Sequence, residues 1–390
     1  MTRRVTSAVL VAVAVLGAAW WLSSNKRRHL VKKCAPPFTT PLVRIASLSD
    51  ATGCTILGKC EFLSVGGSVK DRVASRIVDA SLASGALRPG GLVCEGSAGS
   101  TGVSLALVCA SRGLRCFVAC PSDAAQEKAA TMRALGAVVE VVPPVGITHP
   151  GHFVNVARAK AWAERAAHGG DAALFLDQFE STLNFDAHFE TTGPEIWAQA
   201  GGALAGTKVH AFVAGAGTGG TLAGVAAYLR SRDANITCYL VDPPGSGLYN
   251  RVTKGVMFDA VEADGTRAAH PCDTHIEGVG INRLTANFLL CPRLDGAFRV
   301  NDDECVAMSR HLLRSDGLWL GGSAALNCVG ALRVAMELGP GHTVVTVLCD
   351  GGAKHVSKFW SPEWLASVGL DAFAARGLDW LMEKAASHAG

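Results

Sequence analysis

The sequence reads Gly215-Ala216-Gly217-Thr218-Gly219-Gly220-Thr221 between an apolar run over residues 209–214 and a helical pattern over residues 222–230. This order predicts a strand, a glycine-rich turn and a helix, and the backbone N–H groups at the start of such a helix can bind a phosphate. The glycines also match the pattern G-x-G-x-x-G, and Asp242 follows 22 residues after Gly220, at the end of the next predicted strand. An NAD-binding oxidoreductase is therefore one hypothesis.

Apolar runs of strand length alternate with helical patterns on both sides of this turn, over residues 91–142 and again over residues 208–242. Such alternation is typical of an α/β protein with mostly parallel sheets that are covered on both faces. Parallel sheets bind their ligands at the carboxyl ends of the strands. The glycine-rich turns between strands and helices are therefore the places to look for a site.

A second turn of this kind occupies residues 95–102, between a predicted strand over 91–94 and a predicted helix over 103–110. It places the hydroxyl groups of Ser97, Ser100 and Thr101 at a helix amino terminus, where a carboxylate is favoured. One NAD site does not need two such turns. A phosphate site together with a carboxylate site suits a small phosphorylated cofactor that lies beside an amino acid.

A third feature is the stretch Gly66-Gly67-Ser68-Val69-Lys70-Asp71-Arg72. Ser68 can cap a helix, and Lys70 then lies in its first turn, where the helix dipole disfavours a cation. A lysine whose ammonium form is destabilised can act as a nucleophile and move protons. The ordinary alternative is a solvated surface lysine. We expect Asp71 and Arg72 to stabilise the start of the helix.

These three stretches follow one another along the chain as residues 66–72, 95–102 and 215–221. In this order and spacing they resemble the β-family of pyridoxal-phosphate enzymes (fold type II), the group of cysteine synthase and cystathionine β-synthase. The resemblance extends from Pro41 to about Trp364. Amino-terminally anchored cysteine-synthase-like proteins of mitochondria are more similar to this chain than the soluble enzymes are. Further matching segments are residues 40–44, 178–180, 191–197, 321–323 and 350–352.

The resemblance implies pyridoxal 5′-phosphate as the cofactor and gives roles to individual residues. Lys70 would be the catalytic residue that binds the cofactor covalently, and Ser323 would contact its pyridine nitrogen. Ser100 stands where the family has an Asn that contacts the cofactor 3′ oxygen. The residues implied to hold the phosphate are Gly217, Thr218, Gly219, Gly220 and Thr221, and those implied to bind the substrate carboxylate are Ser97, Ser100, Thr101 and Gln178.

The implied activity is β-elimination or β-replacement on a serine-derived amino acid. The leading hypothesis is a cysteine-synthase-like transferase that uses O-acetylserine or serine together with sulfide or a thiol. A cysteine desulfhydrase and a serine or threonine dehydratase are alternatives within the same chemistry. An NAD-binding oxidoreductase and an inactive scaffold that binds pyridoxal phosphate are alternatives outside it. The resemblance also implies a homodimer.

The composition indicates a folded chain and gives no support to a nucleic-acid-binding protein. The chain has 390 residues, of which 49% are hydrophobic, and a formal net charge of +3. Seven of its 36 basic residues and none of its 33 acidic residues precede residue 34, so the remainder carries −4 and we expect no nucleic-acid partner. Thirteen cysteines without C-x-x-C spacing predict neither disulfides nor a metal site.

The amino terminus contains an uncharged run over residues 5–25 that ends in Trp20 and Trp21 and precedes the cluster Lys26-Arg27-Arg28. A helix of that length would just span a bilayer, and a cleaved signal is the alternative. The pattern predicts a single-pass anchor with the body of the protein on the cytosolic side. The mitochondrial outer membrane is the favoured membrane, and the endoplasmic reticulum is the alternative.

We therefore expect two doubly wound, mostly parallel α/β domains preceded by one transmembrane helix. The smaller domain would occupy residues 64–180 and contain Lys70 and the carboxylate turn. The larger would comprise residues 41–63 plus 181–370 and contain the phosphate turn. The other expected parts are the anchor over 5–25, a basic linker over 26–40 and a helical tail over 371–390.

Overall fold

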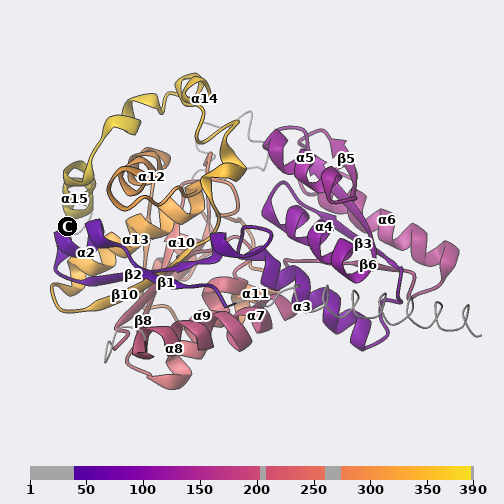
Figure 1. Cartoon of the computed structure of the whole chain (residues 1–390), viewed down its shortest axis with the longest axis horizontal. Coiled ribbons are helices and arrows are strands. Elements are labelled where there is room, and N and C mark those ends of the chain that lie inside the picture. The colour runs from indigo at the N-terminus through magenta and orange to yellow at the C-terminus, as the bar shows by residue number, and fades with distance from the viewer. Residues whose placement is uncertain (1–38, 203–207, 260–273, 388–390) are drawn as a thin grey trace, which may run out of the picture. The chain divides into compact units, whose positions relative to one another are not determined.

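The computed structural model describes residues 39–202, 208–259 and 274–387. The chain divides into two compact units, Met1–Pro36 and Pro37–Gly390, and all described residues belong to the second. This unit contains two separate β-sheets with helices packed on their faces (Figure 1). The prediction of an α/β fold with two mostly parallel sheets is therefore confirmed.

The larger sheet has six strands in the order β1-β2-β10-β7-β8-β9. β1 runs antiparallel to β2, and each other neighbouring pair is parallel. The long connections between parallel neighbours are helical, as a parallel sheet requires. The strands are β1 (Leu42–Arg44), β2 (Thr55–Cys60), β7 (Ala211–Gly215), β8 (Thr237–Asp242), β9 (Gly296–Arg299) and β10 (Thr343–Leu348).

The smaller sheet has four parallel strands in the order β5-β4-β3-β6. Its strands are β3 (Leu92–Gly96), β4 (Arg115–Pro121), β5 (Val138–Val142) and β6 (Ala173–Phe175). All four lie within residues 64–180. The boundaries of the two domains remain a prediction.

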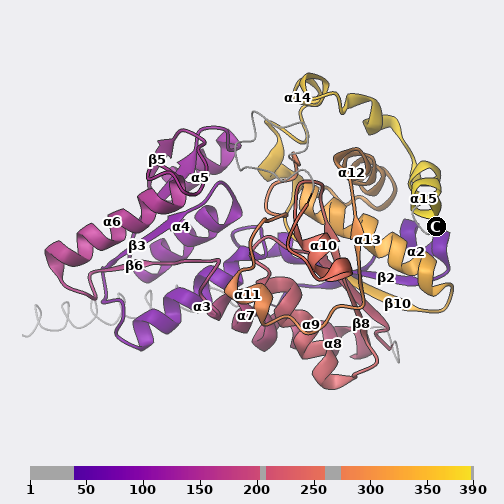
Figure 2. The same ribbon diagram turned by 180° about the vertical axis from the view of Figure 1, so that it is seen from behind.

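Helices cover both faces of each sheet. Figures 1 and 2 show α12 (Asp302–Asp316) and α13 (Gly322–Leu338) on one side of the larger sheet, and α8 (Gly193–Gly202) and α9 (Gly220–Arg232) on the other. In the smaller sheet, α3 (Lys70–Ala83), α4 (Ser100–Arg112) and α5 (Gln126–Ala134) share one buried cluster, and α6 (Phe153–His168) packs on the opposite face. The other helices are α2 (Ala46–Thr52), α7 (Leu183–Ala187), α10 (Leu248–Lys254), α11 (Ala286–Leu289), α14 (Pro362–Ser367) and α15 (Leu378–Ser387), with the short turns η1 (Glu61–Leu63), η2 (His188–Thr192), η3 (Gly352–His355) and η4 (Asp371–Ala375).

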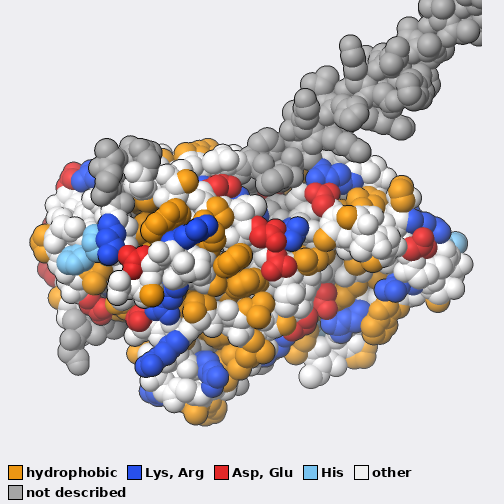
Figure 3. Space-filling view, turned by 90° about the horizontal axis from the view of Figure 1, so that it is seen from below, with side chains coloured by type: hydrophobic (Ala, Val, Ile, Leu, Met, Phe, Trp, Pro, Cys, Tyr) orange, Lys and Arg blue, Asp and Glu red, His pale blue; other side chains and the backbone are white. Residues whose placement is uncertain are grey.

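The core follows from the two-residue period of the strands. In β7, Val213 faces the cluster around α12 and α13, and its neighbours Phe212 and Ala214 face the cluster around α8 and α9. Because both faces of the central strands β7 and β10 are buried, these strands are mostly apolar along their whole length. The eleven cysteines among the described residues are free thiols, and nine of them are buried. On the face seen in Figure 3, basic, acidic and hydrophobic side chains are interspersed.

The prediction of a membrane-anchored chain needs correction. Within the described ranges, no helix combines the length and the apolar character that crossing a bilayer requires. The longest of the described helices, α13, has 17 residues, whereas a span needs about 20 apolar ones. The anchored fold, the outer-membrane or endoplasmic reticulum location and the cytosolic orientation of the body are therefore withdrawn. The predicted helix over 5–25 itself, and the linker up to residue 38, lie outside the described residues.

Candidate active site

A cavity of about 240 Å³ lies where the carboxyl ends of β3, β7 and β10 meet, and it is the place where a parallel α/β protein binds its ligand. The structure brings ten of the eleven predicted site residues to its wall. The exception is Gly220, which begins α9 and packs against Asn184. The ten are Lys70, Ser97, Ser100, Thr101, Gln178, Gly217, Thr218, Gly219, Thr221 and Ser323.

Lys70 is the first residue of α3 and extends into this cavity. The loop before it is fixed by Asp71, which accepts hydrogen bonds from Gly66 N (2.5 Å) and Ser104 Oγ (2.5 Å). A Cβ atom at Gly66 would lie 2.3 Å from that carboxylate, which explains the glycine. Among the described residues, none forms a recorded hydrogen bond or ion pair with Lys70 Nζ. Burial lowers the pKa of the Lys70 ammonium, although the nearby Cys349 and Asp350 oppose the change.

The turn over 215–220 is packed so closely against other segments that side chains do not fit there. A Cβ atom at Gly217 would lie 2.4 Å from the carbonyl oxygen of Gly278. Gly219 has φ = +85° and would bring a Cβ atom within 2.9 Å of the Phe288 backbone. Side chains are thus excluded on the outer side of the turn, and its backbone forms the cavity wall where α9 begins. The hydroxyl groups of Thr218 and Thr221 complete a set of donors that fits a phosphate.

Three predicted carboxylate-binding residues form polar contacts in or with the second turn. Ser97 Oγ accepts hydrogen bonds from the backbone N–H groups of Gly99 and Gly102, both at 3.2 Å, and so fixes the start of α4. Thr101 Oγ1 donates to Gln178 Oε1 at 2.6 Å. Thr101 and Gln178 therefore act as one hydrogen-bonded pair, and Ser97 supports the turn that presents them.

Glu95 continues this chain of hydrogen bonds, and the sequence analysis gave it no role. Its Oε1 accepts from Gln178 Nε2 at 3.1 Å, and its Oε2 is buried without a hydrogen-bond partner among the described residues. Burial raises the pKa of Glu95 to about 8, and nearby Asp177 adds to this effect. A neutral carboxyl at this point avoids placing a negative charge beside a site that is suited to a carboxylate.

We expect the substitution Glu95→Gln to flatten the dependence of stability on pH. The folded pKa of about 8 exceeds the ordinary value of 4.5. The contribution of Glu95 to the free energy of unfolding is therefore fully present below pH 4.5 and is lost as the pH rises to about 8. The variant lacks this titrating group. Between pH 5 and 8 its free energy of unfolding should therefore fall by on the order of 3 kcal/mol less than that of the wild type. Urea denaturation at both pH values measures the difference. Glu140→Gln, at an exposed position, is the control and should match the wild type.

Ser100 donates from its Oγ to Asp350 Oδ2 at 3.1 Å, and His355 Nε2 lies 3.0 Å from the same oxygen. Burial alone would raise the pKa of the Asp350 carboxyl, but the neighbouring His355 lowers it more strongly together with nearby lysines. The Asp350 carboxylate therefore stays ionised. The serine that replaces the family Asn therefore already has a protein partner. An ion pair joins Lys128 of α5 to Glu277, and both residues line the cavity.

Lys128 and Glu277 were missed as site residues because no local pattern distinguishes them, and Asp350 received no role although it belongs to the matching segment 350–352. Lys128 precedes Glu277 by 149 residues, and only the folded chain brings them together. Glu95 is the first residue of the second turn, and this position was the one available signal for it.

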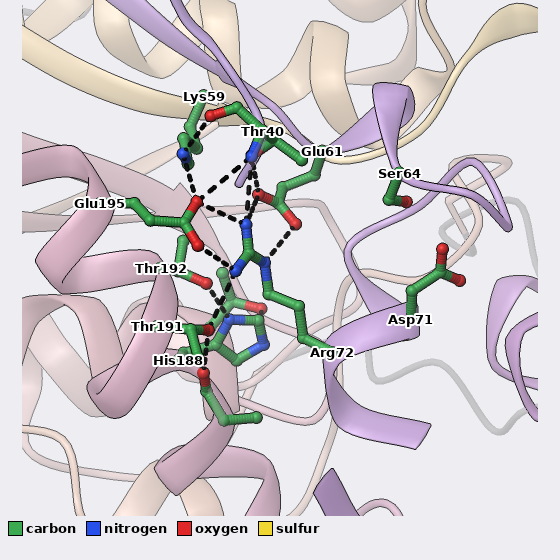
Figure 4. A network of polar contacts seen from close by, with 12 residues as sticks. Thr40, Lys59, Glu61, Ser64, Asp71, Arg72, His188, Thr191, Thr192 and Glu195 are labelled. Carbon is green, nitrogen blue, oxygen red and sulfur yellow. Dashed lines mark hydrogen bonds and ion pairs between the residues drawn. The ribbon is translucent and has the colours of Figure 1, made fainter. Parts of the chain in front are cut away.

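Two residues after Lys70, Arg72 is the centre of a group of charged side chains that are mostly buried (Figure 4). Its guanidinium forms ion pairs with Glu61 of η1 (2.8 Å) and Glu195 of α8 (2.7 Å). Lys59 Nζ also pairs with Glu195, at 2.6 Å, although the Lys59 side chain is completely buried. The positive charges of Arg72 and Lys59 balance the negative charges of Glu61 and Glu195. These ion pairs connect α3 to η1 and α8.

The chain matches the protein family described as "Pyridoxal-phosphate dependent enzyme" over residues 36–350. It is 49% identical over 350 residues to "Cysteine synthase 2" of Schizosaccharomyces pombe, covering 88% of this chain and 86% of that protein. It is 45% identical over 326 residues to the "Putative mitochondrial cysteine synthase" of Saccharomyces cerevisiae, covering 82% and 81%.

Among solved structures, the "O-acetylserine dependent cystathionine beta-synthase from Helicobacter pylori" matches with a TM-score of 0.69 and 30% identity, covering 82% of this chain and 95% of that one. These findings leave the NAD-binding and scaffold hypotheses without support and confirm a cysteine-synthase-like enzyme whose cofactor is pyridoxal 5′-phosphate. The chain belongs to the family of pyridoxal-phosphate-dependent enzymes, in the group of cysteine synthase and cystathionine β-synthase.

Proposed function

We propose that this enzyme is a cysteine synthase that replaces the β-substituent of O-acetylserine with sulfide, giving cysteine and acetate. The observation that carries the proposal is one cavity that joins Lys70, the phosphate turn and the carboxylate turn. The similarity to "Cysteine synthase 2" over 88% of the chain supports the choice of substrates.

When bound, pyridoxal phosphate supplies an electron sink that makes the Cα–H bond of an attached amino acid acidic and lets the β-substituent leave. Lys70 would hold the cofactor through Nζ and, once displaced by the substrate amine, would take the α-proton at the same atom. The lowered pKa of Lys70 suits both tasks, because a neutral amine is the reactive form.

The phosphate would be held by Gly217, Thr218, Gly219 and Thr221 at the wall and by the helix start at Gly220. Ser323, at the start of α13, would contact the pyridine nitrogen. A hydroxyl at that position leaves the ring less protonated than a carboxylate would, which suits β-elimination. In these roles the glycines would contribute backbone N–H groups, and the threonines and Ser323 would contribute hydroxyl groups.

The substrate carboxylate would bind at the amino terminus of α4. Gln178 has one amide hydrogen directed to Glu95 and a second that can reach a ligand, while Thr101 fixes the amide by donating to its oxygen. Ser97 and Ser100 would complete the subsite. Ser100 would also face the cofactor, and its bond to Asp350 would limit its movement.

The decisive experiment supplies the purified holoenzyme with O-acetylserine and sulfide, serine and sulfide, or cysteine alone. We expect cysteine to form fastest from O-acetylserine. Faster sulfide release from cysteine would indicate a desulfhydrase, and pyruvate or 2-oxobutyrate formation from serine or threonine without sulfide would indicate a dehydratase. Either result would overturn the proposal while leaving the family assignment intact.

We further propose that the protein acts as a homodimer and that its two domains have the boundaries given above, 64–180 and 41–63 plus 181–370. Size-exclusion chromatography with light scattering should give about twice the chain mass of 40.4 kDa. A mass of one chain would contradict the dimer.

A further inference from the structure

A π-helical turn, η2, packs against the beginning of α9 behind the phosphate turn. A Cβ atom at Gly224 would lie 2.8 Å from the Cβ of His188 and 2.6 Å from the carbonyl oxygen of Phe185. The glycine therefore allows η2 to approach α9 one turn after Gly220. Single π-turns within helices are frequent at functional sites.

His188, the first residue of η2, is completely buried and uses both ring nitrogens. Its Nε2 lies 3.1 Å from Thr221 Oγ1, and its Nδ1 lies 2.9 Å from Thr192 Oγ1. Thr221 lines the cavity, whereas Thr192 is fully buried behind it. His188 thus connects a cavity hydroxyl to a hydroxyl in the interior.

The imidazole is neutral in this position. Burial lowers the pKa of His188 well below its ordinary value, and the charges of Arg72 and Lys70 act in the same direction. A neutral imidazole has one N–H donor and one acceptor nitrogen, so the two hydroxyl groups cannot play the same role.

The buried Thr192 hydroxyl decides which nitrogen carries the proton. Among the described residues, His188 Nδ1 is the one hydrogen-bond partner recorded for this hydroxyl. A buried donor without an acceptor is costly, so Thr192 donates to Nδ1 and the ring proton is on Nε2. Nε2 then donates to Thr221 Oγ1, which leaves the Thr221 hydroxyl proton free to point into the cavity.

The neighbouring charged group fixes the same turn. Arg72 Nη1 donates to Thr191 Oγ1 at 3.0 Å, and Figure 4 shows Thr191, Thr192 and His188 stacked beside the guanidinium. Thr191 and Thr192 are adjacent in sequence, but only Thr192 contacts the imidazole. Substitutions of Thr192 and Thr191 therefore form a matched pair, because the two residues are neighbours and only Thr192 forms a hydrogen bond with the imidazole.

We propose that His188 is a positioning residue that orients the Thr221 hydroxyl as a donor toward the cofactor phosphate. The inference rests on the proposed function, in which the turn over 217–221 holds that phosphate. It adds a residue that does not touch the cofactor but sets the direction of a hydroxyl that does.

The test measures the dissociation constant of pyridoxal phosphate for the apoprotein, by fluorescence titration, and the ³¹P chemical shift of the bound phosphate. We expect His188→Leu to weaken binding roughly tenfold, as for the loss of a hydrogen bond to a charged group. His188→Gln retains an N–H at the end of the side chain and should stay within about threefold of the wild type. Both the affinity and the ³¹P shift of Thr192→Val should change in the same direction as those of His188→Leu.

Thr191→Val is the matched control and should leave both the affinity and the ³¹P shift at their wild-type values. If His188→Leu does not fold, the comparison of Thr192→Val with Thr191→Val decides the question. Equal results for these two variants, or an unchanged ³¹P shift in both His188→Leu and Thr192→Val, would overturn the inference alone. A wild-type apoprotein that fails to bind pyridoxal phosphate would overturn the proposed function as well.

Discussion

Substitution of Lys70 by alanine is expected to abolish the yellow absorption band of the protein and to lower cysteine formation by at least about 10³-fold. The variant loses both the covalent attachment of the cofactor and the group that moves the α-proton, and general acid–base catalysis alone contributes 10²–10⁴-fold. Lys70 lines the cavity, and among the described residues none forms a hydrogen bond or ion pair with its Nζ. The measurements are the visible spectrum and the initial rate.

Lys354→Ala is the matched control for this result. Lys354 is also a half-buried lysine whose pKa is lowered by burial, and it lies beside the same loop. Its Nζ, however, donates to the carbonyl oxygen of Gly66 at 2.5 Å and does not line the cavity. The control should keep the yellow band. A band that persists in Lys70→Ala would contradict the role given to Lys70.

Substitution of Arg72 by methionine is expected to destabilise the folded enzyme by about 3–5 kcal/mol. The guanidinium makes six hydrogen-bond contacts through its five N–H groups, with Thr40, Glu61, Thr191 and Glu195, and is almost completely buried. Without it, the Glu61 carboxylate is left buried and uncompensated, and Lys59 alone faces Glu195. Guanidinium denaturation of the holoenzyme measures the loss.

Arg76→Met tests whether the effect comes from burial and not from the loss of an arginine. Arg76 lies one helical turn further along α3 and also pairs with a glutamate, Glu190, at 2.8 Å. The side chains of this pair are 38% and 49% exposed, so its removal should cost less than about 1 kcal/mol. Equal losses for the two variants would show that the buried ion pairs contribute no more than the exposed one.

Local patterns predicted the phosphate turn, the carboxylate turn and the helix that begins at Lys70. Each depends on residues that are adjacent in sequence, since a glycine turn between a strand and a helix is a local structure. The phosphate-binding roles stay predictions, and Gly220 is the one predicted site residue that lies outside the cavity wall. It does not line the cavity, because it faces Asn184, and that contact between α7 and α9 is not visible in the sequence.

The anchor is the prediction that the structure contradicts. Apolar length over residues 5–25 was the signal, and among the described helices none is long and apolar enough to cross a bilayer. Hydropathy along the chain reports how apolar a segment is, but the fold decides whether that apolar surface meets lipid or a protein core.

The sequence by itself determined the α/β class and the order of the three glycine-rich stretches, because each stretch is encoded in residues that are adjacent along the chain. The family resemblance of these stretches gave the cofactor, and the role of Lys70 stays a prediction. Only the tertiary structure decided the protonation of Glu95, the pairing of Lys128 with Glu277, the ion pairs of Arg72 and the tautomer of His188. Those properties depend on burial and on partners many residues away. Burial and distant charges act through space, and the linear sequence does not contain the distances that set their strength.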